Sequence, residues 1–220
     1  MQGLAGTSCA LGILPVGGGN DLARVLGVDR EPRRAAERAV EATPRRIDLG
    51  RLEGRAFAGV LGLGIDGDVS RRVAQGLRWL PGGLAYAWAT LLCVPRFRAP
   101  WVRVDYEGGS FEGRVLIAAL ANSPVFGGGM RIAPAARLDD GWLDLVIVER
   151  VAPATVLRVF PRVYSGTHVD HPAVHTRRVR AATLRSEPCR TFWADGEPLC
   201  DSRPGGTAIE VWPAGLAVVV

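Results

Sequence analysis

The sequence predicts an α+β protein with two parts, a short α/β segment over residues 1–44 and a mostly β domain over residues 45–220. A short apolar strand followed by two amphipathic stretches opens the chain. From residue 45 onward, the pattern changes to short alternating runs with glycine-rich turns. With 220 residues, 48% of them apolar, the chain is long enough to bury a substantial core.

The first strand and helix are predicted from an apolar run and a change of period. Leu11 to Leu14 is a short apolar strand that ends at Pro15. Asn20 or Asp21 can cap a helix that continues to about Gly27. We therefore expect a strand, a glycine-rich turn and a helix in direct succession.

A second helix is expected immediately afterwards. Asp29 is its candidate cap, and Pro32 fits its first turn. An apolar strand such as 11–14 belongs in a parallel sheet covered on both faces, and such sheets need several βα units. Only ten residues precede this strand, so residues 1–44 are expected to be the last part of a larger α/β domain.

The larger domain is expected to be built from short strands with three helices between them. The predicted strands are 47–52, 56–61, 102–106, 115–120, 143–148, 179–184, 191–194, 208–211 and 216–220. The predicted helices are 69–75, 84–94 and 153–164, and Pro161 is expected to kink or end the last of them.

The basic residues exclude several kinds of chemistry. All 27 are arginine, so the sequence contains no lysine for a P-loop, a protein-kinase strand or a Schiff base. The net charge of +5 suits nucleotides, anionic lipid surfaces or nucleic acid. Because the arginines are scattered and lack an aromatic-basic stripe, we expect no nucleic-acid partner and a solvated surface for most of them.

Other sequence features predict a cytoplasmic protein with reduced thiols. The four cysteines, Cys9, Cys93, Cys189 and Cys200, form no CxxC pair, which argues against zinc and against a redox dithiol. No apolar run approaches the ~20 residues of a membrane span. The N-terminus has no basic region ahead of an apolar core, so no secretion signal is indicated.

The string "PVGGGND" at residues 15–21 is a candidate phosphate loop. Three glycines let the backbone approach an anion closely, and the following helix N-terminus adds partial positive charge. An ordinary strand-to-helix turn explains the glycines equally well. The string alone does not decide between the two.

Two further strings place carboxylates at tight turns. Asp139 and Asp140 precede Gly141 in "LDDGW", an arrangement that suits a hard cation but more often forms a plain turn. Asp195 and Glu197 flank the glycine of "WADGEPL", where one carboxylate could take a proton and the other orient it. A simple Asp-Gly hairpin is the competing interpretation.

All three histidines lie in one stretch, "HVDHPAVH". The spacing of His168, His171 and His175 could place metal ligands on a helix, but Pro172 interrupts any helix there. A solvated loop is therefore expected.

Two further features have both a structural and a functional interpretation. Asp66 lies between a strand and a helix, where capping and a role in a site are equally plausible. The helix at 84–94 carries Leu84, Trp88, Leu91 and Leu92, which could contact a lipid chain, although a core helix is the preferred interpretation.

Taken in order, these strings resemble one family. "LGILPVGGGNDLAR", "RRIDLGRL", "GLGIDGDV", "NSPVFGGGMRIAPAARLDDGWLDLVIV" and "WADGEPL" resemble the bacterial diacylglycerol kinase and sphingosine kinase-like lipid kinases. The resemblance implies an α/β nucleotide-binding domain like that of NAD kinases, of which residues 1–44 are the C-terminal part. It also implies a β-sandwich over 45–220, with the active site in the cleft between the two.

The resemblance implies a nucleotide site in the first segment. Gly17, Gly18, Gly19 and Asn20 would contact the phosphates of ATP, and Asp21 would join a magnesium-linked acidic network. The family usually has Thr or Ser at the position of Gly18, so a hydroxyl contact is lost while the backbone cradle survives.

It also implies roles for the acidic turns. Asp195 would be the general base that takes the proton of a lipid hydroxyl, with Glu197 supporting it, and Mg²⁺ would neutralise charge on the transferred phosphate. Asp140, with the backbone carbonyls of Arg137 and Trp142, would form a second, structural magnesium site.

The family's Gly-Gly-Asp-Gly-Thr loop does not occur in these residues. The sequence is therefore expected to be the C-terminal two-thirds of an ATP-dependent lipid kinase that begins at an internal methionine. It would act on a diacylglycerol-like lipid at the membrane surface, and a homodimer is left open. Two alternatives remain: a catalytically silent lipid- or partner-binding β-sandwich, and a soluble-substrate kinase related to NAD kinase.

Overall fold

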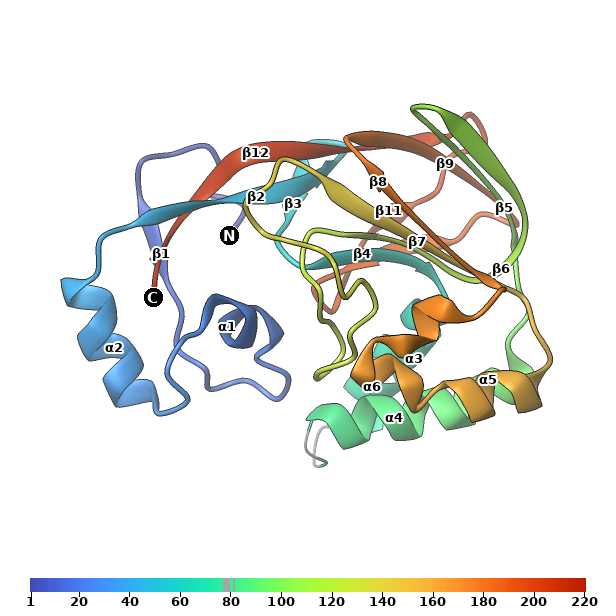
Figure 1. Ribbon diagram of the computed structural model, residues 1–220, viewed down its shortest axis with the longest axis horizontal. Coiled ribbons are helices and arrows are strands. Elements are labelled where there is room, and N and C mark those ends of the chain that lie inside the picture. Colours follow the sequence, from blue (N-terminus) through green and yellow to red (C-terminus); the bar gives the residue numbers. More distant parts are fainter. Residues whose placement is uncertain (77–79, 81) are drawn as a thin grey trace.

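A computed structural model of the chain describes residues 1–76, 80 and 82–220 (Figure 1). The helices are α1 (Asp21–Leu26), α2 (Pro32–Glu41), α3 (Ile65–Gly76), α4 (Gly82–Cys93), α5 (Pro153–Val159) and α6 (Arg162–Ser165), with 3-10 turns at Val94–Arg96 and Thr167–Asp170. The strands are β1 (Ala10–Gly12), β2 (Arg45–Leu52), β3 (Arg55–Phe57), β4 (Val60–Gly64), β5 (Trp101–Tyr106), β6 (Gly109–Ala121), β7 (Leu143–Glu149), β8 (Val174–Val179), β9 (Ala181–Glu187), β10 (Thr191–Ala194), β11 (Glu197–Asp201) and β12 (Thr207–Val219). The predicted α+β class is confirmed.

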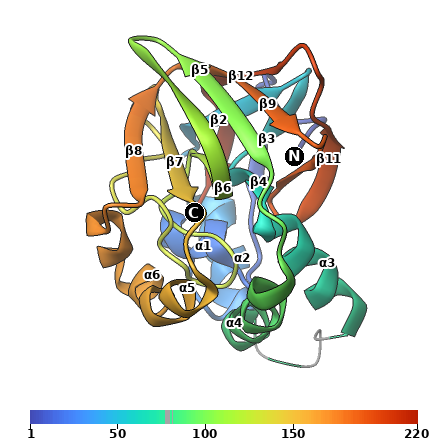
Figure 2. The same cartoon turned by 90° about the vertical axis from the view of Figure 1, so that its right-hand side faces the viewer.

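The strands form one hydrogen-bonded network that folds into two layers. Long strand β6 joins the layers, because residues 109–114 pair with β5 while residues 117–121 pair with both β4 and β7. Strand β12 pairs with β9, β2 and β1 along its length. Helices α3 to α6 lie at one end of this sandwich, away from α1 and α2 (Figure 1), and the view from that end shows them below the strands (Figure 2).

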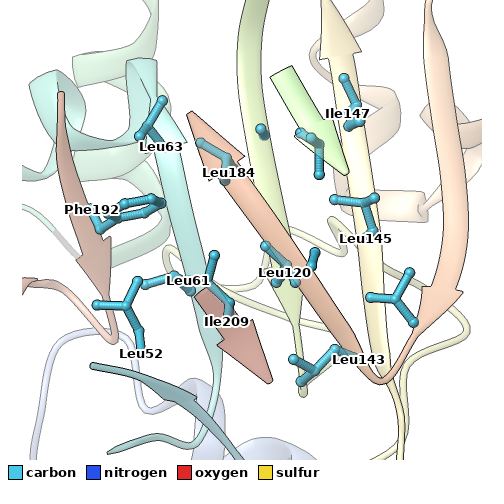
Figure 3. Packing of buried hydrophobic residues seen from close by; sticks show 14 of the residues in the cluster. Leu52, Leu61, Leu63, Leu120, Leu143, Leu145, Ile147, Leu184, Phe192 and Ile209 are labelled. Atoms are coloured by element: carbon cyan, nitrogen blue, oxygen red, sulfur yellow. The ribbon is translucent and has the colours of Figure 1, made fainter. Parts of the chain in front are cut away.

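The main core lies between the two layers. Leu61, Leu120, Leu145 and Phe192 from one layer and Leu184 from the other are almost fully buried (Figure 3). Burying such a side chain stabilises the fold by roughly 1.5–3 kcal/mol. Alternation along each strand directs these residues inward, which explains why sequence periodicity locates most of the strands.

The N-terminal segment joins the sandwich through its last strand. Strand β1 pairs in parallel with β12, with Ala10 opposite Ala217, and every other strand pair of the described residues is antiparallel. The predicted parallel pairing is therefore found. However, the strand covers 10–12 rather than 11–14, and its partner is the C-terminal strand.

Several predicted boundaries differ from the structure. Predicted strand 56–61 is two strands, β3 and β4, whereas predicted strands 208–211 and 216–220 are one strand, β12, with a shift of register after Trp212. Strands β8 and β11 were not predicted. The helix over 153–164 is interrupted near Pro161, as expected, giving α5 and α6.

Helix α2 has a different cap from the one predicted. The side chain of Glu31, not Asp29, accepts the N–H of Arg33 in the first turn, while Asp29 accepts the N–H of Glu31. Pro32 opens the helix, as expected. Among the described residues, no helix combines the length and apolar character needed to cross a membrane.

Candidate active site

A cleft of about 580 Å³ lies where four segments meet. They are the loop at 19–21 before α1, the β3–β4 turn at 58–59, the loop at 123–128 after β6, and the β10–β11 turn at 195–197. Motifs separated by more than 170 residues therefore line one cavity. The sequence suggested each motif alone, and the fold brings them together.

Asp195 occupies the turn between β10 and β11 with a left-handed backbone, φ 52°. Its carboxylate accepts the N–H groups of Ala58 and Gly59, both at 2.9 Å. The residue is exposed overall, but protein atoms surround the carboxylate, and this desolvation raises its pKa. The N–H groups at 58–60 oppose this rise, and the charge of Glu197 adds to it.

Two glycines allow this arrangement. A Cβ at Gly59 would lie 2.5 Å from Oδ1 of Asp195, so any side chain there would displace the carboxylate. Gly196 has φ 87°, which closes the tight turn. Glu197 follows as the first residue of β11 and lines the same cleft. Asp195 and Glu197 are therefore placed together, as their spacing suggested.

The glycine-rich loop is held by one side chain. Oδ1 of Asn20 accepts the N–H of Gly17 at 2.9 Å, and Nδ2 of Asn20 donates to the carbonyls of Gly17 and Pro15 at 2.7 and 3.1 Å. Asn20 is left-handed, with φ 51°, and its side chain does not cap α1, contrary to the expectation. Gly19 and Asn20 line the cleft, whereas Gly17 and Gly18 are exposed beside it.

Asp21 joins the loop to the opposite wall of the cleft. Its Oδ2 accepts the N–H of Gly128 at 2.7 Å, and its Oδ1 accepts from Arg24 at 2.8 Å. Burial raises its pKa, opposed by these two donors. In the part of the chain that the structure describes, no three His, Cys, Asp or Glu side chains are placed to hold a metal. Asp21 therefore links the loop to the opposite wall of the cleft, and its role in a magnesium-linked acidic network stays a prediction.

The predicted structural magnesium site at Asp140 stays a prediction. The carboxylate of Asp140 accepts the N–H of Trp142 at 3.1 Å and is in close contact with the Arg178 guanidinium. The side chain of Arg137 pairs with Asp139, whereas the prediction concerns its backbone carbonyl. A cation bound by Asp140 would compete with Arg178 for this carboxylate. None of Arg137, Asp140 and Trp142 lines the cleft.

The histidines form no common site, and the predicted solvated loop is wrong for two of them. His168 is buried, and its Nε2 lies 3.2 Å from the carbonyl of Ile132, while burial lowers its pKa. His175 lies on β8, and its Nε2 is 2.5 Å from Glu149. Only His171 is in a loop, where its ring accepts the N–H of Ala173.

Helix α4 does not have the predicted core face. Its small residues Ala85 and Ala89 are buried, whereas Leu84, Trp88 and Leu91 are 63%, 52% and 39% exposed. The core-helix interpretation is therefore wrong for this face. An apolar stripe on a 12-residue helix does not by itself reveal which side faces the protein.

A second, apolar cavity of about 130 Å³ was not predicted from the sequence. It lies among α3, α4, α5, α6 and the layer that contains β6, and its lining includes Val69, Ile117, Phe160 and Val163. Four residues line both this cavity and the cleft: Asp66, Ser70, Tyr86 and Phe126. The cleft and the apolar pocket are therefore adjacent, with these four residues between them.

The two-layered sandwich that carries the cleft is of the NAD kinase-like class, as the comparison with family models shows. Residues 59–220 match the YegS C-terminal NAD kinase beta sandwich-like domain, and residues 1–52 match the diacylglycerol kinase catalytic domain. The chain therefore belongs to the bacterial diacylglycerol kinase and YegS-like lipid kinase family. The domain boundary expected at 44/45 falls inside the range 1–52, which matches the diacylglycerol kinase catalytic domain, and it stays a prediction.

Named relatives and solved structures agree with this family. The chain is 33% identical to a diacylglycerol kinase of Mycobacterium tuberculosis (strain ATCC 25618 / H37Rv), over 100% of this chain and 72% of the relative. It is 31% identical to a diacylglycerol kinase of Bacillus subtilis (strain 168), over 80% of this chain and 59% of the relative. A crystal structure of a diacylglycerol kinase from Bacillus anthracis str. Sterne shares the fold, with a TM-score of 0.71, 17% identity and coverage of 100% of this chain and 69% of that one.

Proposed function

We propose that the chain is the lipid-binding and proton-accepting part of an ATP-dependent kinase that phosphorylates the hydroxyl of a diacylglycerol-like lipid. The observation that carries this proposal is that the cleft at Asp195 lies next to an apolar pocket and shares four lining residues with it. A substrate for such a site has a hydroxyl at one end and an apolar chain at the other. Diacylglycerol has this chemistry, whereas a soluble dinucleotide does not.

In this proposal, Asp195 accepts the proton of the lipid hydroxyl. A carboxylate with a raised pKa is a better general base near neutral pH, and Glu197 raises that pKa further. The lipid oxygen forms its bond to the γ-phosphorus as the bond from phosphorus to the β–γ bridging oxygen breaks, and ADP leaves. Activity should therefore fall as the pH drops and Asp195 becomes protonated.

The glycine-rich loop is the proposed phosphate contact. Gly17, Gly18, Gly19 and Asn20 supply backbone groups beside the helix N-terminus, and the Asn20 side chain fixes their conformation. Mg²⁺ bound with ATP would neutralise charge on the transferred phosphate. Because kinase Mg²⁺ is held largely by substrate phosphates and one or two carboxylates, Asp21 and Glu197, which line the cleft, are the candidate protein ligands.

The exposed face of α4 supports a peripheral position at the membrane. Leu84, Trp88 and Leu91 are exposed on α4, and Leu157 is exposed on α5, at the end of the sandwich that holds the apolar pocket. Apolar side chains of this kind, with a positively charged chain, suit the surface of an anionic bilayer. We place the enzyme in the cytoplasm, where ATP is available, in contact with the inner membrane surface.

The direct test is transfer of labelled phosphate from ATP to diacylglycerol in detergent micelles, with NAD as the competing acceptor. Asp195→Asn should lower kcat by roughly 10²–10⁴-fold, because the amide cannot take the proton. Asp201→Asn is the matched control, since Asp201 lies on the same hairpin and accepts a hydrogen bond from Thr191. Full activity of Asp195→Asn, or a preference for NAD, would contradict the proposal.

A further inference from the structure

Asn122 lies behind the turn that holds the candidate base. It directly follows β6 and is completely buried. Because Val60 of β4 pairs with Ala121 of β6, the strand register brings Asn122 opposite Gly59. Asn122 does not belong to the lining of the cleft. Any effect of this side chain on the reaction must therefore pass through other residues.

The side-chain amide of Asn122 donates two hydrogen bonds. Its Nδ2 donates to the carbonyl of Asp48 at 2.7 Å and to the carbonyl of Ala58 at 2.9 Å. A carbonyl oxygen only accepts, so the amino group of the amide must face these two atoms. Its Oδ1 is shielded from solvent and has no hydrogen-bond partner among the described residues. Because an unpaired buried acceptor costs free energy, the two donated bonds are the reason to keep an amide here.

One of the two carbonyls belongs to a peptide unit that also contacts Asp195. The carbonyl of Ala58 and the N–H of Gly59 are the two ends of one planar trans peptide, so they point in opposite directions. The carbonyl accepts from Asn122 at 2.9 Å, and the N–H donates to Oδ1 of Asp195 at 2.9 Å. The amide of Asn122 therefore fixes the rotation of the peptide unit that holds the candidate base.

The next peptide unit repeats this arrangement. The backbone N–H of Asn122 donates to the carbonyl of Gly59 at 2.9 Å. At the other end of the same peptide unit, the N–H of Val60 is a hydrogen-bond donor to the carboxylate of Asp195. Two successive peptide units are thus held by Asn122 on the carbonyl side and by Asp195 on the N–H side.

The second hydrogen bond of the amide anchors Asn122 to a fixed part of the sheet. Asp48 lies in β2 and is buried. Its carboxylate accepts the N–H groups of Gly141 and Ala214, both at 2.7 Å, and its own N–H donates to the carbonyl of Leu138 at 2.6 Å. The amide therefore connects the turn at 58–59 to a residue that three other segments hold in place.

We propose that Asn122 is a positioning residue for Asp195, which it aims at the lipid hydroxyl by holding the peptide unit between Ala58 and Gly59. This proposal rests on the proposed function, because it takes Asp195 as the base. Without the amide, the peptide unit can rotate, and Gly59 has no side chain to resist the rotation. Its N–H then no longer holds the carboxylate in one orientation.

The first test needs neither ATP nor lipid. Labelling alanine with ¹³C at the carbonyl and glycine with ¹⁵N selects the three Ala-Gly pairs of the sequence in an NMR spectrum. The amide proton of Gly59 is the one whose resonance moves upfield in Asp195→Asn, because a neutral acceptor forms a weaker hydrogen bond than a carboxylate. Asn122→Leu, which keeps the branched shape and removes both donors, should move the same resonance upfield.

The matched control is Thr207→Val. Thr207 is also completely buried, and its hydroxyl accepts the N–H of Arg203 at 3.1 Å, away from the cleft. This variant also loses a buried hydrogen bond, yet it should leave the Gly59 resonance and the activity unchanged. If Asn122→Leu does not fold, Asn122→Ala removes the same two donors.

The second test measures phosphate transfer to diacylglycerol, with rates divided by the folded fraction. Asn122→Leu should lower kcat about 10- to 100-fold and leave the KM for ATP unchanged, since only the aim of the base is lost. In an Asp195→Asn background, the same substitution should cause no further loss, because the group through which it acts is gone. A residue that only stabilises the fold would have the same effect in both backgrounds.

The proposal is wrong if Asn122→Leu leaves the Gly59 resonance in place, or if it lowers kcat by the same factor with and without the Asp195 carboxylate. Failure of the proposed function would look different. A chain that transfers no phosphate, or whose Asp195→Asn variant is fully active, contradicts the role of Asp195 as a base. An upfield shift of the Gly59 resonance in Asn122→Leu would still show that Asn122 positions this carboxylate.

Discussion

At the scale of single residues, Gly59 determines where the candidate base lies. It donates its N–H to Asp195 and leaves no space for a side chain. Gly59→Ala should push the carboxylate aside and lower kcat at least tenfold, at a stability cost of about 1–3 kcal/mol from overpacking. Kinase assays and urea unfolding measure the two effects separately.

The matched control for this change is Gly205→Ala, since a Cβ at Gly205 meets nothing within 4 Å. It should leave both activity and stability near the wild-type values. If Gly59→Ala behaves in the same way, the close contact with Asp195 does not position the base.

Asp144 predicts a pH dependence of stability that is opposite to the usual behaviour of a carboxylate. The residue is 8% exposed, and burial raises its pKa to about 6, with Arg178 opposing the rise and Asp140 adding to it. Between about pH 4 and pH 6 the folded state binds more protons than the unfolded state, so this group makes the protein less stable as the pH rises.

The substitution Asp144→Asn should therefore stabilise the folded state more at higher pH. The unfolding free energy of Asp144→Asn relative to the wild type should rise by up to about 3 kcal/mol between pH 4 and pH 7. Urea denaturation across this range measures it. Asp105→Asn should show the opposite sign, because Arg103 lowers the pKa of Asp105. If the difference in unfolding free energy between Asp144→Asn and the wild type does not change with pH, the pKa of Asp144 is the same in the folded and unfolded states.

At the scale of elements, the exposed apolar residues of α4 lead us to expect binding to a lipid bilayer. Its exposed Leu84, Trp88 and Leu91 form one apolar face. A Trp88→Ser and Leu91→Ser double variant should lose much of its binding to vesicles that contain anionic lipid, measured by co-sedimentation, with the fold intact. The control is Val40→Ser, because Val40 is exposed on α2, away from this end of the molecule. Equal losses in both would contradict the assignment of this face.

Local pattern explains which elements the sequence could predict. Strand 191–194 was predicted to the residue, because its Thr, Phe and Trp favour β structure. Strand β8 reads "VHTRRV", in which all four central residues are polar, so alternation alone gives no signal. The exposed face of α4 was misjudged for a related reason, because an apolar residue on a helix has the same sequence signature whether it lies at the surface or in the core.

At the scale of the whole molecule, contacts between distant segments are the part of the structure that the sequence alone does not predict. The order of the motifs was enough to predict the two-part fold and the family, and both are confirmed. The contact between Asp21 and Gly128 joins residues 107 positions apart, and no local pattern reports it. The close contact of Arg178 with Asp140 joins residues 38 positions apart and is likewise absent from any local pattern.

The parallel pairing of β1 with β12 has a consequence for the order of events during synthesis. Residues 10–12 reach their strand partner only when residues 217–219 have been made. Pairing β1 with β12 closes a long loop at a large cost in chain entropy. An unfinished copy that lacks residues 217–219 has no strand partner for β1, and the loop that follows β1 then lacks this support.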